Sequence, residues 1–204
     1  MKTSLGKIVT IGGGVVAGGI LLWYLLRRKK DEDMVLSTNN PNGIIYSSNQ
    51  LNPTPAGVPS KADLQDETKL RQVFDLITKT YGKPIAQNVE RIYRWETGHF
   101  KSGQYLASGS AGMTTNKTSY PWGWSSLRPL FDRKPELKPV GTVKFIVEGK
   151  EYTYLAFPGA AGFIALAEIL KLRDNNPGRW NSNEQSAIDR YNQALTGIRL
   201  RFTA

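Results

Sequence analysis

The most regular segment of the chain is PIAQNVERIYRWETGHF, residues 84–100. Its apolar side chains recur three or four positions apart on one face, which comprises Ile85, Val89, Ile92 and Tyr93. This spacing predicts an amphipathic helix that begins after the proline and ends at Gly98. The same face continues at position 96, where the pattern favours a hydrophobic residue and the chain has Glu96. A carboxyl group is therefore expected on the inner face of this helix, near its end.

Glu96 is the candidate for acid–base chemistry. A carboxyl group that is half-buried among aromatic neighbours favours its neutral form, which a general acid needs near neutral pH. Gly98 would leave this side chain at the rim of a cleft walled by loops. The alternative is a surface glutamate that ends a helix and pairs with Arg91 or Arg94. Composition alone favours this alternative, because most paired carboxylates are structural.

Three further helices are predicted on either side of this segment. An apolar face over residues 70–81 predicts a helix that is ended by Gly82-Lys83-Pro84. A similar face predicts a helix over Gly162–Leu172. The last helix is expected to begin with Ser182-Asn183-Glu184-Gln185, a capping box, and to continue through Ile198.

A β-hairpin is predicted between these helices. Val143–Val147 and Tyr152–Phe157 alternate in polarity about the turn residues Glu148-Gly149-Lys150. Between Gly98 and Pro139 the chain is rich in Gly, Ser, Thr, Pro and aromatic residues, which indicates long loops. The expected fold class is therefore mainly α (α+β), a helical domain with one small β-hairpin.

The predicted loops carry side chains suited to holding a sugar. Flat apolar faces on which a sugar ring can stack come from Tyr105, Tyr120, Trp122, Trp124 and Phe131. Hydrogen bonds to hydroxyl and acetamido groups can come from Ser102, Gln104, Ser108, Ser110 and Asn116. For Trp124 and Phe131, a place in the hydrophobic core is an equally good interpretation.

The order of these segments resembles a known family. The motifs are Glu96-Thr97-Gly98 at a helix end, then Phe100, Ser102 and Gln104, then Gly112-Met113 and Trp122-Gly123-Trp124. They resemble the lysozyme-like fold, most closely the bacterial and phage lytic transglycosylases and the glucosaminidase-type peptidoglycan hydrolases. A strand with Tyr152 and Tyr154, a Pro-Gly turn and two later helices continue the likeness, which covers roughly residues 65–204.

The resemblance implies that Glu96 protonates the glycosidic oxygen between two amino sugars, while the N-acetyl group of the substrate or a water completes the displacement. One carboxylate then suffices, and no cofactor or metal is expected. The substrate-binding residues it implies are Ser102, Gln104, Tyr105, Met113, Tyr120, Trp122, Tyr152, Tyr154 and Tyr191. Glycosidases with a second carboxylate hold it roughly 5–9.5 Å away. Its candidates here are Asp132, Glu136, Glu148 and Glu151.

The N-terminal segment predicts a membrane anchor. Residues 8–26 read IVTIGGGVVAGGILLWYLL without a charge, close to the ~20 apolar residues that cross a bilayer. The block Arg27-Arg28-Lys29-Lys30 follows as a stop-transfer signal, which favours an anchor over a cleaved signal peptide. By the positive-inside rule, the same block predicts that the C-terminal domain is cytoplasmic. The expected organisation is an anchor at 1–30, a Pro/Asn/Gly-rich linker at 31–62 and a lysozyme-like catalytic domain at 63–204.

Composition narrows the classes of function. The 27 Lys and Arg against 17 Asp and Glu give a net charge of +10, which favours polyanionic partners. Because the chain has no cysteine, disulfides, thiolate metal sites and thiol catalysis are excluded. His99 is the one histidine, so a histidine metal site or a Ser-His-Asp triad has little support.

Two functions follow from the sequence. The first is a membrane-anchored glycosidase that cleaves peptidoglycan, in a phage virion membrane or a bacterial inner membrane, with lipid contacts through residues 8–26. The second is a non-catalytic structural membrane protein that links a viral membrane to capsid proteins or to the genome. Nucleic-acid binding is an open alternative for the basic surface but is not favoured.

Overall fold

Helix α4 (Lys83–Glu96) is the element around which the other helices pack. It contacts α3 (Glu67–Tyr81), α7 (Ala161–Leu172) and α9 (Gln185–Thr196). Contact on several sides buries more of α4 than one face, and its buried residues are Ala86, Val89, Glu90, Ile92, Tyr93 and Arg94. The predicted helix is confirmed, but it is not the one-sided amphipathic helix that its apolar spacing indicates, because two charged residues are also buried.

The computed structural model describes residues 49–115, 124–147 and 149–204. They belong to one compact unit that ends at Ala204. The predicted membrane helix at 8–26 lies outside the described residues. Within the described part of the chain, no helix is long and apolar enough to cross a membrane.

The predicted helices upstream and downstream of α4 are confirmed, with shifted ends. Helix α3 begins at Glu67, because the Asp66 carboxylate accepts hydrogen bonds from the backbone nitrogens of Thr68 (2.8 Å) and Lys69 (3.0 Å). Helix α9 begins at Gln185 and not beside Ser182. A short helix, α8 (Gly178–Asn181), occupies the chain just before Ser182.

The region between Gly98 and Pro139 is more helical than its composition predicts. It contains α5 (Gly103–Ser108), α6 (Trp124–Arg133) and a 3-10 turn, η1 (Pro135–Leu137). Helix α5 is capped by Ser102 and ended by Gly109, and α6 buries Leu127, Leu130 and Phe131. The prediction of long loops was therefore wrong for both segments, because local caps and burial outweigh a polar, glycine-rich composition.

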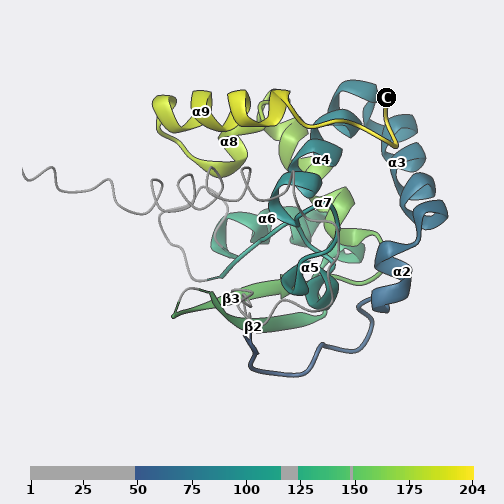
Figure 1. Ribbon diagram of the computed structural model, residues 1–204, viewed down its shortest axis with the longest axis vertical. Helices are drawn as coiled ribbons and strands as arrows, with labels where there is room; N and C mark the ends of the chain where they lie inside the picture. The colour runs from purple at the N-terminus through teal and green to yellow at the C-terminus, as the bar shows by residue number, and fades with distance from the viewer. Residues whose placement is uncertain (1–48, 116–123, 148) are drawn as a thin grey trace, which may run out of the picture. The chain divides into compact units, whose positions relative to one another are not determined.

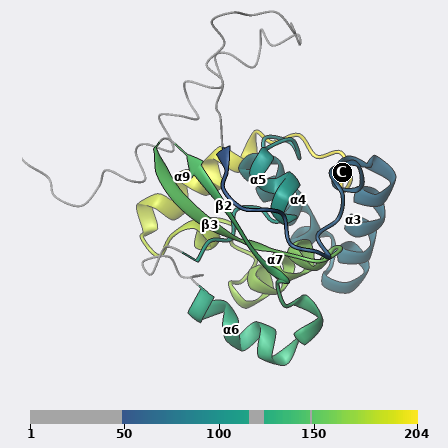
Figure 2. The same cartoon turned by 90° about the horizontal axis from the view of Figure 1, so that it is seen from below.

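The predicted hairpin is confirmed as β2 (Gly141–Val147) and β3 (Lys150–Ala156), paired antiparallel. A two-residue strand, β1 (Asn49–Gln50), pairs with the other edge of β2. Figures 1 and 2 show this small sheet along one side of the helices, with α5 and α7 close to it. The described domain is thus mainly helical with one small antiparallel sheet.

Part of the predicted linker belongs to the domain. The Asn52 side chain donates to the Thr142 carbonyl (2.9 Å) and accepts from the Lys144 backbone nitrogen (2.6 Å), so it continues the pairing that β1 begins. Residues 49–60 therefore lie along the sheet edge and lead into α2 (Lys61–Gln65). The boundary expected at residue 62 was too late, because this contact with the sheet depends on side-chain pairing that composition does not reveal.

An aromatic cluster forms the centre of the core. Tyr93 of α4 stacks on Phe163 of α7 with ring centroids 3.9 Å apart. Phe74, Phe100, Tyr105 and Phe202 surround this pair. The close approach of α7 requires Gly162, since a Cβ there would lie 2.5 Å from the Gly109 carbonyl oxygen and 3.0 Å from the Tyr93 hydroxyl.

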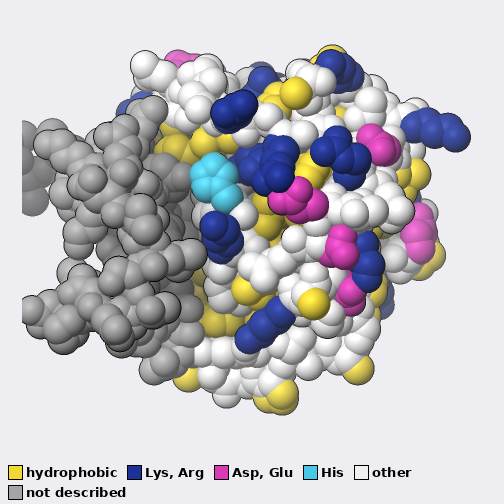
Figure 3. Space-filling view, turned by 45° about the vertical axis from the view of Figure 1, so that its right-hand side comes forward, with side chains coloured by type: hydrophobic (Ala, Val, Ile, Leu, Met, Phe, Trp, Pro, Cys, Tyr) yellow, Lys and Arg dark blue, Asp and Glu magenta, His cyan; other side chains and the backbone are white. Residues whose placement is uncertain are grey.

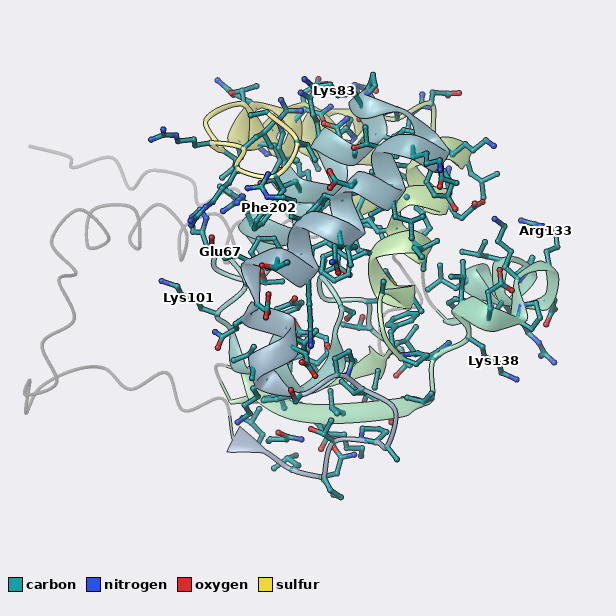
Figure 4. All side chains as sticks on the ribbon, turned by 90° about the vertical axis from the view of Figure 1, so that its right-hand side faces the viewer. Glu67, Lys83, Lys101, Arg133, Lys138 and Phe202 are labelled. Carbon is teal, nitrogen blue, oxygen red and sulfur yellow. The ribbon has the colours of Figure 1, made fainter. Side chains whose placement is uncertain are left out.

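The chain ends in a segment that we call the C-terminal strap, residues 197–204. It leaves α9, passes α4 and ends beside α3 (Figures 1 and 2). Figure 4 shows Phe202 and Glu67 close together at α3, where the Arg201 guanidinium forms an ion pair with Glu67 at 2.7 Å. Phe202 is 8% exposed and stacks on Phe74 with centroids 5.4 Å apart.

Glu90 of α4 binds the strap through its carboxylate. Its carboxylate is fully buried and accepts from the backbone nitrogens of Arg201 (2.7 Å), Phe202 (3.1 Å) and Thr203 (2.9 Å). The Thr203 hydroxyl (2.8 Å) and the Arg94 guanidinium (2.7 Å) also donate to it. Burial by itself raises the pKa of Glu90, but these hydrogen bonds outweigh it and hold the pKa below its ordinary value of 4.5.

Gly162→Ala is expected to lower the free energy of unfolding by about 1–3 kcal/mol, the usual cost of overpacking a core. The physical reason is that the new methyl group meets a backbone carbonyl that cannot move without shifting α5. Urea denaturation measures the change. Gly197→Ala is the control, because Gly197 is exposed and has a right-handed backbone. Equal stability of the two variants would contradict the packing at Gly162.

Glu90→Gln is expected to lower the free energy of unfolding at pH 7 by about 3–5 kcal/mol, as when one partner of a buried ion pair is removed. A lowered carboxyl pKa contributes stability above the ordinary value of 4.5 that is lost as pH falls through the folded value. The difference in free energy of unfolding between wild type and variant should therefore become smaller below pH 4.5. Denaturation curves over a pH series measure this, with Glu67→Gln as an exposed control. A difference in free energy of unfolding that does not change with pH would show that the charge of Glu90 does not stabilise the fold.

Candidate active site

The end of α4 is held in an unusual backbone conformation. Gly98, His99 and Phe100 follow one another with φ of 55°, 59° and 68°, all in the left-handed region. Each such residue with a side chain costs roughly 1–2 kcal/mol. Burial of Phe100, which is 5% exposed, in the aromatic core offsets that strain.

Thr97 fixes the same turn through its side chain and its carbonyl. The hydroxyl donates to the Tyr93 carbonyl and accepts from the Phe100 backbone nitrogen at 2.9 Å. The Thr97 carbonyl accepts from the backbone nitrogens of Lys101 (3.0 Å) and Ser102 (2.8 Å). These hydrogen bonds tie the last turn of α4, which carries Glu96, to the segment that follows it.

Glu96 is half-buried and meets two groups from distant parts of the chain. The Tyr191 hydroxyl of α9 donates to its Oε1 at 2.6 Å. Its Oε2 faces Gly112, where a Cβ atom would lie 4.0 Å away. Gly112 has φ +90, so glycine is favoured there on backbone grounds as well. One carboxyl oxygen thus accepts a hydrogen bond from a tyrosine of α9, and the other faces Gly112.

Tyr154 of β3 lies near the same carboxyl group, close enough that the charge of Glu96 acts on its hydroxyl. Tyr152 and Tyr154 stack with centroids 6.2 Å apart. Burial, with the nearby Tyr152 and the charge of Glu96, raises the pKa of Tyr154 well above its ordinary value. Its hydroxyl therefore stays neutral near neutral pH and can donate a hydrogen bond to a ligand.

A serine-rich segment carries the chain from α5 to Gly112. Ser108 and Ser110 hydroxyls lie 3.2 Å apart, and Gln104 donates to Ser108 at 2.6 Å. Further along, the Met113 carbonyl accepts from the Leu155 backbone nitrogen at 2.8 Å. This segment therefore joins the free edge of β3 and passes beside Glu96.

The structure brings Glu96, Tyr154 and Tyr191 together, and Tyr152 stacks on Tyr154. The three tyrosines come from β3 and α9, far from Glu96 in sequence. Three other predicted ligand-binding residues, Ser102, Gln104 and Ser110, have structural roles of their own. Ser102 caps α5, and Gln104 with Ser110 belongs to the interior serine network.

Other predicted ligand-binding residues lie in the core, which corrects the prediction for them. Tyr105 is fully buried and its hydroxyl donates to the Leu64 carbonyl at 2.9 Å. Met113 is 2% exposed, and Phe131, for which both roles were open, is 4% exposed. A polar, glycine-rich setting indicated a groove, but these side chains fill space between helices. Tyr120, Trp122, Asn116 and the Trp124 side chain lie outside the described residues.

The structure gives partners for both arginines that were expected as alternative partners of Glu96, and for one candidate second carboxylate. Arg94 pairs with Glu90, and Arg91 donates to Asn88 at 2.8 Å, so each has a partner other than Glu96. Glu151 pairs with Lys144 at 2.9 Å and alternates with Tyr152 and Tyr154, so it projects from the other face of the sheet.

Asp132 and Glu136 are exposed at α6 and η1, and Glu148 lies outside the described residues. In the described part of the chain, no group of three or more His, Asp and Glu side chains could hold a metal.

A cavity of about 390 Å³ lies elsewhere, between α2, α3 and the start of α7. Its lining is mainly apolar and includes Leu70, Val73 and Phe163, with the ion pair of Lys69 and Asp63 beside it. Glu96, Tyr154 and Tyr191 are not among its lining residues. The carboxyl group and this cavity are therefore separate features.

Two parts of the site were not predicted as functional. Gly112 was recognised only within a motif, although a glycine between buried residues is a signal for close backbone approach. Glu90 and Arg94 are four residues apart on a helix, which is the usual spacing of an exposed ion pair. Nothing in the sequence therefore indicated that this pair is buried.

No family model, curated protein or solved structure was found that matches this chain. What the site can do is therefore argued from its own residues.

The hydrogen bond between Glu96 and Tyr191 should appear as a coupling energy of about 1 kcal/mol or more in a double-mutant cycle. The variants are Glu96→Gln, Tyr191→Phe and their combination, and chemical denaturation measures each free energy of unfolding. The cost of Tyr191→Phe should be largest when the carboxylate is present. Additive effects would show that the two side chains do not interact in solution.

Proposed function

We propose that this protein is a peptidoglycan-cleaving glycosidase of the lysozyme-like class, with Glu96 as its catalytic acid. The observation that carries the proposal is the placement of Glu96. It stands at the end of the central helix with Oε1 bonded to Tyr191 and Oε2 beside Gly112. In this proposal the proton sits on Oε2, on the side of Gly112, and the glycosidic oxygen of the substrate approaches from that side.

Glu96 in this proposal gives its proton to the oxygen of the scissile bond as the bond from that oxygen to the sugar carbon breaks. The acetamido oxygen of the substrate, or a water, then bonds to that carbon. The ionised Glu96 takes a proton back from the attacking hydroxyl group, which comes from water in hydrolysis or from the sugar in anhydro-sugar formation. No second carboxylate is needed in the substrate-assisted form.

The tyrosines beside Glu96 suit a sugar ligand. The stacked pair Tyr152 and Tyr154 offers aromatic surface on which the less polar face of a sugar ring can lie. The neutral hydroxyl of Tyr154 can donate to a sugar hydroxyl or acetamido carbonyl. Aromatic surface with a few polar groups is the usual lining of a site for an uncharged ligand.

The N-terminal segment sets the cellular context of the proposal. An anchor at residues 8–26 would hold the enzyme in a bacterial inner membrane or in the membrane of a phage virion. The basic block at 27–30 favours a cytoplasmic domain. A virion reconciles this with a wall substrate, since a domain packaged during assembly can meet the wall during entry.

A second candidate is a non-catalytic protein that links a viral membrane to capsid proteins or to nucleic acid. The net charge of +10 favours it. Figure 3, however, shows basic side chains interspersed with acidic ones on the face it presents. Several basic side chains of the domain form ion pairs, among them Arg201 with Glu67 and Lys144 with Glu151. A mixed surface of this kind is a weaker polyanion site than a continuous basic stripe.

Glu96→Gln is expected to abolish lysis of purified peptidoglycan sacculi, because a general acid contributes about 10²–10⁴-fold and the swap keeps the shape of the side chain. The full chain, purified in a mild detergent, is assayed by loss of turbidity on sacculi from several hosts. Glu151→Gln is the matched control, an identical change on the other face of the sheet. Mass spectrometry of the products separates hydrolysis from anhydro-sugar formation.

Two outcomes would overturn the proposal. Absence of lysis by wild type on every type of sacculus would favour the structural role. Equal lysis by wild type and Glu96→Gln would leave a glycosidase with a different catalytic acid.

A further inference from the structure

We propose that Glu90 is a positioning residue for the active site: by anchoring the C-terminal strap, it holds α9 where Tyr191 donates its hydrogen bond to Glu96. The inference rests on the proposed function, because it concerns how the proposed catalytic acid is held. Glu90 itself is fully buried beneath the strap and acts through Tyr191.

The two carboxylates and the two segments they bind form a closed ring. Glu90 and Glu96 belong to the same helix, six residues and about 9 Å apart along its axis. Glu96 holds α9 through Tyr191, and Glu90 holds the strap that continues from α9. The spacing of the two contacts is therefore set by one rigid element, α4.

The connection between these contacts is short. Four residues, 197–200, separate the end of α9 from Arg201, and four residues span at most about 14 Å. A fixed strap therefore restricts the C-terminal end of α9. Ile188 and Leu195 of α9 are also buried, so release of the strap should displace the helix without unfolding it.

Glu90 accepts more hydrogen bonds than a single contact with the strap would supply. Five donors meet the Glu90 carboxylate, three of them successive backbone nitrogens of residues 201–203. The Phe202 ring between them lies 5.1 Å from the Arg94 guanidinium carbon. Removal of one donor should therefore loosen the strap without leaving the carboxylate bare, which makes Thr203→Val a mild variant.

Release of the strap has a chemical consequence distinct from lost stability. A donor on Oε1 favours the ionised form of Glu96, so a weaker Tyr191 contact keeps the acid protonated to higher pH. The alkaline limb of the pH profile of kcat should then move up by as much as about one pH unit, the effect of one hydrogen bond to a charged group. kcat should fall more than KM rises, because the sugar-binding tyrosines of β3 are untouched.

The test compares Glu90→Gln and Thr203→Val with Glu67→Gln, each in the wild-type chain and in Tyr191→Phe. Glu67→Gln is the matched control, since it removes an exposed carboxylate that touches the same strap. We expect both strap variants to move the alkaline limb in the direction that Tyr191→Phe moves it. In the Tyr191→Phe background they should add no further shift.

Two results would overturn the inference. One is a shift of the same size in the Tyr191→Phe background, which would show that Glu90 does not act through Tyr191. The other is an unchanged pH profile in a Thr203→Val protein whose strap amides exchange hydrogen faster, which would show that a loosened strap leaves the site intact.

A second measurement separates this inference from the proposed function. The coupling between Glu96 and Tyr191 in unfolding free energy needs no substrate and is measured again in the Thr203→Val chain. A reduced coupling supports the positioning role even if wild type fails to cleave sacculi, whereas an unchanged coupling overturns it. Failure of lysis with reduced coupling would therefore reject only the glycosidase.

Discussion

The buried carboxylate of Glu90 ties the last residues of the chain to the helix around which the domain is built. Isolated, a charge in that position would be strongly unfavourable. Its cost is offset because Arg94 and the backbone and hydroxyl groups of residues 201–203 all donate to it. The arrangement makes α4 a common support for α3, α7, α9 and the C-terminal strap, so the parts of the candidate site share one frame.

The strained turn after α4 shows a similar balance. Left-handed backbone at His99 and Phe100 is unfavourable by itself, and the burial of Phe100 against Tyr93 and Tyr105 retains it. The turn ends α4 at Glu96 and directs the chain into α5. Strain, core packing and the position of the carboxyl group are therefore consequences of one local arrangement.

Local signals in the sequence were sufficient for most regular elements. The helices α3, α4 and α7 and the hairpin were predicted because each has an unbroken apolar period of its own. Helices α5 and α6 were missed because their glycine, serine and proline content indicates loops. The Ser102 cap stabilises α5, and burial of Leu127 and Phe131 stabilises α6. Tyr105 was misassigned for the same reason, since an aromatic side chain in a polar segment fits a groove and a core equally well.

The sequence by itself determined that a helix ends at Glu96 and that Glu96 continues its apolar face, because helical periodicity depends only on residues close together in the chain. Tertiary structure decided that Tyr191, 95 positions away, donates to that carboxyl group and that Gly112 lies on its other side. It also decided that Glu90, with the spacing of a solvent-exposed ion pair, is buried under the chain terminus. Contacts of this kind depend on how separate elements pack, and no local period of the chain encodes them.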